Sequence, residues 1–167
     1  MKSAPSYWTG WRLDQIMLDK SDYYHGAAII RLMDDGRCWS VRKLQQLGYI
    51  VNDEVFIFLK YTTKSRTPWG FTFDQEDVER CLKMATEYHN VILGFICGGD
   101  GVCALHWCEA KELLGGKAGR IAAGRKHNHS YSVWGTCGEL KQKIPVGRWL
   151  SLAFESNNQL FYKIGKL

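Results

Sequence analysis

The sequence has no long hydrophobic run and no stretch rich in Gly, Pro or Ser that would serve as a linker. Its longest apolar candidate, residues 91–97, has the length of a strand, whereas a membrane-spanning helix needs about 18 or more apolar residues. The first eleven residues lack the apolar run of a signal peptide. Internal repeats and low-complexity segments are also absent. These absences predict a single domain over residues 1–167, intracellular and soluble (cytoplasmic or nuclear), with no membrane partner.

Several well-known catalytic and cofactor-binding motifs are absent as well. The sequence contains no P-loop, Gly-x-Gly-x-x-Gly, His-Glu-x-x-His or Gly-x-Ser-x-Gly motif. This excludes the usual NTPase, dinucleotide-binding, metalloprotease and serine hydrolase classes. The segment Gly98–Gly101 is rich in glycine, but it lies between two apolar runs rather than between a strand and a helix. It therefore predicts a hairpin turn and not a phosphate-binding loop.

Cysteine is not scarce, yet its spacing indicates neither disulfides nor a zinc site. A reducing compartment favours free thiols at all six positions, which are Cys38, Cys81, Cys97, Cys103, Cys108 and Cys137. The set Cys97, Cys103, His106 and Cys108 has the spacings C-x5-C and C-x2-H-x-C, which zinc knuckles do not use. Cys97 and Cys103 flank the predicted turn and are expected to be neighbours across two strands. We predict no metal ligands and no certain cofactor from these residues.

The charge of the chain is unevenly distributed. The chain contains 22 Lys and Arg residues and 17 Asp and Glu residues, which gives a formal net charge of +5. Residues 115–167 contain nine basic and two acidic side chains and so carry +7, while residues 1–114 carry −2. A basic C-terminal third predicts a polyanionic or acidic partner, and nucleic acid is the commonest such partner.

Hydrophobic periodicity and turn residues predict an α/β (α+β) domain with a mixed central sheet flanked by helices. Helices are expected at residues 22–35, capped by Ser21 or Asp22 and ended by Gly36, from Asp74 onward, and at 109–114 before Gly115. Strands are expected at 38–44, 48–53, 55–63, 91–97, 102–107, 120–125, 130–134, 140–144 and 149–154. The C-terminal portion, residues 115–167, is therefore predicted to be basic and rich in strands.

The strand predicted at residues 55–63 carries the most informative pattern. It lies within Asn52-Asp-Glu-Val-Phe-Ile-Phe-Leu-Lys-Tyr-Thr-Thr-Lys64, after one helix and before Pro68-Trp69 and a second helix. This layout resembles the restriction-endonuclease-like, or PD-(D/E)xK, nuclease superfamily, whose core runs helix, strands, helix, strand. The resemblance covers about residues 22–97. It implies a restriction-endonuclease-like core.

The resemblance also implies candidate catalytic residues. Lys60 stands where the family has its lysine, and Asp53 and Glu54 are the candidate acids that would hold Mg²⁺ against a scissile phosphate. The position matching the second acid is Phe58, so the motif is degenerate. The resulting hypothesis is a nucleic-acid-binding protein with a degenerate nuclease-like core, with Mg²⁺ as the cofactor if it is an active endonuclease.

Two cationic segments supply the candidate nucleic-acid-binding residues. Residues 60–69 hold three cations, two aromatic side chains and four Ser or Thr hydroxyls, which suit phosphates and bases. The second segment, residues 120–129, holds three cations and two histidines, and Lys141 and Lys143 follow it. The full set is Lys60, Lys64, Arg66, Trp69, Arg120, Arg125, Lys126, His127, His129, Lys141 and Lys143. The alternative for Trp69 is an indole folded onto the core. If the two segments meet in space, they form one cationic face.

A second hypothesis remains open for the whole protein. The basic region and the aromatic residues Trp8, Trp11, Tyr23 and Tyr24 also suit a catalytically silent interaction or inhibitor module that docks on an acidic protein partner. The sequence predicts no particular oligomeric state.

Overall fold

The computed structural model describes residues 17–45 and 47–155. Its elements follow in the order α1 (Lys20–Met33), β1 (Val41–Leu44), β2 (Gly48–Val51), β3 (Val55–Thr62), β4 (Trp69–Phe73), α2 (Gln75–Glu87), β5 (Asn90–Cys97), β6 (Val102–His106), α3 (Trp107–Leu114), β7 (Gly119–Gly124), β8 (Ser132–Gly135), β9 (Gly138–Glu139) and α4 (Arg148–Phe154). Two of the predicted interface aromatics, Trp8 and Trp11, lie outside the described residues.

The central sheet has five strands in the order β1-β2-β3-β5-β6. β1, β2 and β3 form an antiparallel meander, β5 is parallel to β3, and β6 is antiparallel to β5. A parallel neighbour requires a crossover connection, which β4 and α2 provide between β3 and β5. The predicted mixed sheet flanked by helices is confirmed.

A second, fully antiparallel sheet has the order β4-β7-β8-β9. Sequence reasoning missed its first strand, β4, although the signal is present. Trp69, Phe71 and Phe73 alternate with Gly70 and Thr72, and the three aromatic side chains are buried while the residues between them are not. This period of two is the pattern of a strand with one face on a core.

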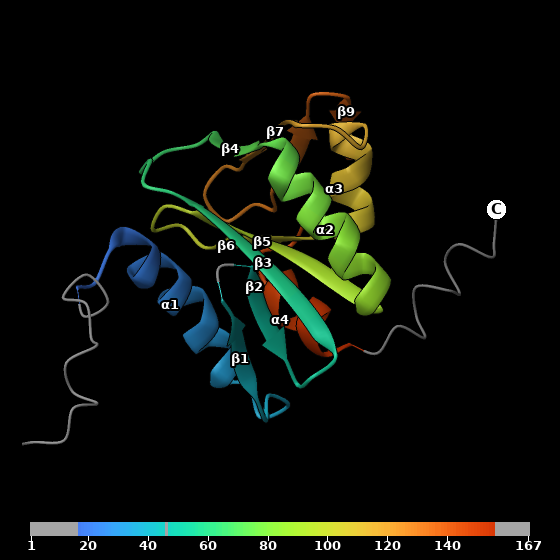
Figure 1. Ribbon diagram of the computed structural model, residues 1–167. Coiled ribbons are helices and arrows are strands. Elements are labelled where there is room, and N and C mark those ends of the chain that lie inside the picture. Colours follow the sequence, from blue (N-terminus) through green and yellow to red (C-terminus); the bar gives the residue numbers. More distant parts are fainter. Residues whose placement is uncertain (1–16, 46, 156–167) are drawn as a thin grey trace, which may run out of the picture.

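The two sheets and four helices form layers around two apolar clusters (Figure 1). α1 and α4 cover one face of the central sheet, with Leu32 and Trp149 among the residues buried there. The other face of that sheet contacts α2, α3 and the inner face of the second sheet. β3 is covered on both sides, which explains why its first five residues are all apolar and buried.

The helix boundaries follow their capping residues, with one correction. The side chain of Asp74 caps α2 as predicted, and Gly115 ends α3 with the left-handed φ of 66°. α1 instead begins after Asp19, whose carboxylate accepts the amide N–H of Asp22. It ends at Met33 with Asp34 as its C-cap, so the predicted cap Gly36 lies in the turn that follows the helix.

The C-terminal portion is less rich in strands than predicted. Residues 149–154, expected as a strand, lie in the helix α4. Trp149, Leu152 and Ala153 are buried there at positions i, i+3 and i+4, a helical spacing, and the segment contains no β-branched residue that would favour a strand. The strand predicted at 140–144 is reduced to one bridge between Ile144 and Tyr131.

All six cysteines are free, as predicted. Cys97 and Cys103 lie in the same buried cluster on adjacent strands, although Cys103 pairs directly with Phe95. Burial raises the pKa of the Cys97 thiol to about 12, so that thiol stays protonated and unreactive near neutral pH. None of the described helices combines the length and the apolar character needed to cross a bilayer.

Candidate nucleic-acid interface

The carboxyl ends of the parallel strands β3 and β5 lie side by side, with Thr62 in register with Cys97. Two connections leave from this end, residues 63–68 after β3 and the turn 98–101 after β5, and Figure 1 shows both projecting from the same side of the central sheet. The amide N–H of Gly98 donates to the carbonyl of Thr62 and ties the two connections together. Polar residues placed here therefore converge although they are distant in sequence.

A third loop, residues 125–130 after β7, joins this end of the molecule. β7 pairs with β4, and the amide N–H of Arg125 donates to Oγ1 of Thr67 at 3.2 Å. We call the three loops, residues 63–68, 98–101 and 125–130, the cationic end. Together they contain four Lys or Arg residues, two histidines and one acid. The two cationic segments expected from the sequence are thus adjacent in the structure.

The single acid of the cationic end, Asp100, is already paired. Its carboxylate accepts bonds from Nε and Nη2 of Arg125 at 2.6 and 2.9 Å and from the hydroxyl of Tyr131 at 2.7 Å. Burial alone would raise the pKa of Asp100, but these bonds outweigh it and hold the pKa below its ordinary value. Arg125 also donates through Nη1 to the carbonyl of His129, so the same contacts fix the loop.

The remaining cations of this end face solvent. Lys64, Arg66, Lys126, His127 and His129 are all exposed. Lys64 donates to the carbonyl of Pro68 at 2.8 Å, a contact that leaves it able to reach other acceptors. Because Asp100 is neutralised by Arg125, these side chains present an excess of positive charge with no free carboxylate among them.

Three further predicted residues lie in the strands of the second sheet or follow them in sequence. Lys143 donates to the hydroxyl of Ser132 in β8, and Ser132 pairs with Gly124 immediately before the Arg125 loop. Lys141 is exposed, and Arg120 lies exposed on β7. Through Ser132, Lys143 is connected to the strand position that precedes the Arg125 loop.

Trp69 is not available to stack on a base. Its side chain is 3% exposed, its Nε1–H donates to the carbonyl of Lys64 at 3.0 Å, and its ring meets Tyr131 edge to face. This is the alternative in which the indole folds onto the core. Trp69 supports the 63–68 loop from beneath and takes no part in the exposed surface.

Lys60 lies apart from the exposed cations and is engaged in an ion pair. Its Nζ is 2.7 Å from Oδ2 of Asp77 in α2, with the two side chains 21% and 13% exposed. Arg80 lies 3.6 Å from the other oxygen of Asp77. The ring of Phe58, where the resemblance would require a second acid, is approached by both Lys60 and Arg80. These cations therefore make cation–π contacts with Phe58.

Replacing Lys60 with methionine is expected to lower the free energy of unfolding by about 1–2 kcal/mol. The cost is moderate because Asp77 keeps Arg80 and the amide of Asp74 as partners. Urea unfolding measures it, with Lys83→Met on the exposed side of α2 as the control that leaves stability unchanged. Equal stability of the two variants would show that the Lys60–Asp77 pair is energetically neutral.

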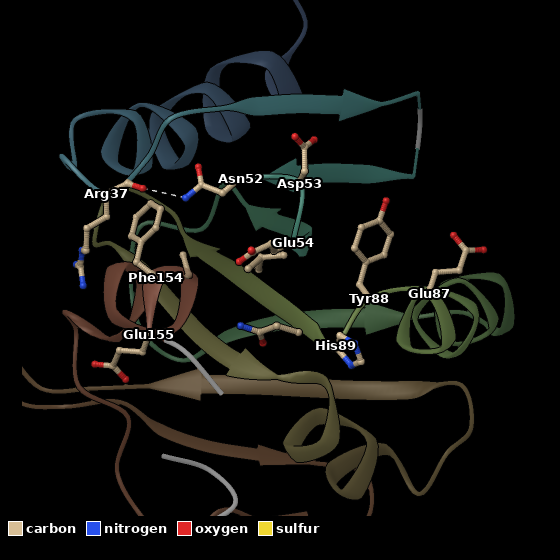
Figure 2. Close-up of a pocket in the computed structure, with 12 residues that line it drawn as sticks. Arg37, Asn52, Asp53, Glu54, Glu87, Tyr88, His89, Phe154 and Glu155 are labelled. Atoms are coloured by element: carbon tan, nitrogen blue, oxygen red, sulfur yellow. Dashed lines mark hydrogen bonds between the residues drawn. The ribbon is translucent and has the colours of Figure 1, made fainter. Parts of the chain in front are cut away.

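Asp53 and Glu54 lie at the opposite end of β3. They precede the strand, and six residues of extended chain separate Glu54 from Lys60 by about 20 Å. Both line a pocket of about 770 Å³ together with Glu87, His89 and Glu155, which Figure 2 shows. Asp53 is also within 3.6 Å of Arg42. The structure therefore does not bring the two candidate acids together with Lys60.

Within residues 17–45 and 47–155, no three His, Cys, Asp or Glu side chains converge in a way that could hold a metal ion.

No protein-family model, curated protein or solved structure matches the chain. The case for a function therefore depends on the geometry and charge of the described residues. Sequence reasoning missed Thr67 and Asp100 as organisers of the site, because only the paired strands reveal which loops meet.

Proposed function

We propose that this protein binds nucleic acid through the cationic end and does not cleave it by a metal-dependent mechanism. The observation that carries the proposal is the contact between Thr67 and Arg125, residues 58 positions apart, which places two basic loops side by side. The only acid in these loops is neutralised by Arg125. A surface with clustered cations and no free carboxylate attracts phosphates.

The element order supports a degenerate nuclease-like core. A helix, a three-stranded meander, a second helix and a strand parallel to the third occur in this order, with β4 of the second sheet inserted before the second helix. Apart from β4, this is the layout of the restriction-endonuclease-like resemblance. Phe58 at the acidic position, the ion pair of Lys60, and the distance of Asp53 and Glu54 from it argue against assembly of the metal site. Binding without cleavage is the function that agrees with both sets of facts.

Binding is tested by fluorescence anisotropy with labelled DNA and RNA oligomers across a salt series that begins at about 50 mM. We expect measurable affinity at the lowest salt concentration. The logarithm of the affinity should then fall linearly with the logarithm of the salt concentration, and the slope reports the number of phosphate contacts. Absence of affinity for every oligomer at about 50 mM salt would contradict the proposal, because electrostatic contacts are strongest there.

Incubation of the same oligomers with Mg²⁺ or Mn²⁺ is expected to leave them intact on a denaturing gel. The physical reason is that Lys60 is held by Asp77 and the two acids lie about 20 Å away. Cleavage that requires the metal and disappears in the Lys60→Met variant would overturn this part of the proposal and establish an active endonuclease.

A second function, docking on a protein partner, has its own supporting observation. The exposed side of α1 carries Tyr23, Ile30 and Met33, with 65%, 56% and 61% of their surfaces exposed. Tyr24, which the sequence also suggested as an interface residue, stacks on Tyr61 and is half-buried. A stoichiometric protein complex that survives nuclease treatment and is lost in Ile30→Glu would favour this second function.

A further inference from the structure

The second sheet presents a face that the core does not cover. Along β4, β7 and β8 the residues that point away from the core alternate with those in the apolar cluster. We call this set the outer face, and it consists of Gly70, Thr72, Arg120, Ala122, Gly124, Ser132 and Trp134. Trp134 is one of the few large apolar side chains exposed in the described chain, at 38%.

Two glycines let the largest side chains of the outer face lie flat on the sheet. The guanidinium group of Arg120 covers Gly70, where a Cβ atom would collide with it. The indole of Trp134 covers Gly124, where a Cβ would approach its ring to 3.1 Å. The six-membered ring of Trp134 thus lies against the backbone at Gly124, and 38% of the Trp134 surface is exposed. This is a geometry suited to stacking of a planar group.

The charge of the outer face matches that of the neighbouring cationic end. Arg120 is exposed on it, and Lys143 reaches it by donating to Ser132. Glu139, in the edge strand β9, is an acid that pairs with Trp134. Thr67 lies against both Gly124 and Arg125, so the outer face continues into the cationic end without a break.

We propose that the nucleic acid bound by this protein is single-stranded, with one base stacked on Trp134 and the adjoining phosphates held by Arg120 and Lys143. The inference depends on the proposed function, since it concerns the same ligand. It assigns the aromatic contact to Trp134, which replaces the buried Trp69 in that role.

The physical argument for a single strand is that stacking on an exposed indole needs a base whose face is free. In a duplex each base face is already covered by its neighbours, and only a terminal pair or an unstacked base offers one. An open sheet face with one exposed aromatic ring and neighbouring cations suits a single nucleic-acid strand whose bases are not stacked on one another. It provides no helix or ribbon that would enter a major groove.

The experiment compares three probes at about 50 mM salt. They are an oligothymidylate of about 20 nucleotides, a duplex of the same length, and an oligomer of the same length that lacks bases. We expect wild-type protein to bind the oligothymidylate more tightly than the duplex. Trp134→Ala should reduce oligothymidylate affinity about tenfold, Trp134→Phe should retain most of it, and neither should change affinity for the abasic probe.

Trp39→Ala is the matched control, because Trp39 is 68% exposed before β1 and away from the second sheet. Its affinities should equal those of wild type. Equal loss of affinity for all probes in Trp134→Ala, with Trp134→Phe no better, would identify a structural role and overturn the inference. Preference for duplex, or an unchanged Trp134→Ala, would overturn it while leaving the proposed function standing. No binding of any probe by wild type would overturn both.

Discussion

Replacing Lys64, Arg66, Lys126 and Lys143 together with alanine is expected to lower the affinity for single-stranded nucleic acid by about 10³–10⁴-fold at about 50 mM salt. Each cation that neutralises a phosphate releases about 0.7 counterions from a single strand, which contributes close to one order of magnitude at this salt concentration. All four side chains are exposed and are expected to contact phosphates.

The slope of log affinity against log salt should decrease by about 3 in the same variant. The control replaces four exposed lysines elsewhere, Lys43, Lys83, Lys111 and Lys117, and so removes the same formal charge. Its affinity should fall far less, because only long-range attraction is lost. Equal weakening of the two variants would mean that net charge, and not the meeting of the two loops, determines binding.

Replacing Asp100 with alanine is expected to lower the free energy of unfolding by about 2–3 kcal/mol. The substitution removes the partner of two Arg125 bonds and leaves the Tyr131 hydroxyl unpaired, and the Tyr131 side chain is fully buried. Asp100 is 24% and Arg125 13% exposed, so part of the loss is screened by water. Urea unfolding at neutral pH measures the effect.

The contribution of Asp100 should depend on pH with a defined sign. The pKa of Asp100 in the folded protein is below its ordinary value of 3.8, so folding favours the ionised form. Its stabilisation is therefore fully present above pH 3.8 and is lost as the pH falls toward the lower, folded pKa. The stability difference between wild type and Asp100→Ala should consequently shrink in acid.

Tyr131→Phe is the matched control for Asp100, because it removes one hydroxyl and keeps the ion pair with Arg125. We expect it to cost about 1 kcal/mol. A cost for Asp100→Ala no larger than that of Tyr131→Phe would show that the pair with Arg125 contributes nothing to stability. A difference that stays constant from neutral to acid pH would contradict the ionised form as its source.

Local pattern predicted most of the central sheet. The apolar run of β3, the capping Asp74 of α2 and the turn at Gly98–Gly101 each carry their signal within a few residues. The errors have local causes too. Residues 149–154 are too short and too uniformly apolar for the pattern to separate helix from strand, and their burial against α1 selects α4.

The site was predicted in its composition but not in its arrangement. Lys64, Arg66 and Lys126 were candidates because of their charge, and all three are exposed. Sequence pattern did not indicate that Lys60 would be paired with a helix residue, and it left open whether Trp69 would be buried. Those facts depend on which strands become neighbours, and strand pairing between distant segments is weakly encoded in local sequence.

The sequence by itself determined that the C-terminal third is basic, that β3 is buried on both faces, and that the apolar residue Phe58 stands two positions before Lys60. Composition and periodicity suffice for these because each is a property of consecutive residues. Only the tertiary structure decided that Thr67 meets Arg125 and that Asp100 neutralises this arginine. The pairing of β4 with β7 sets that contact, and it turns two separate basic segments into one surface.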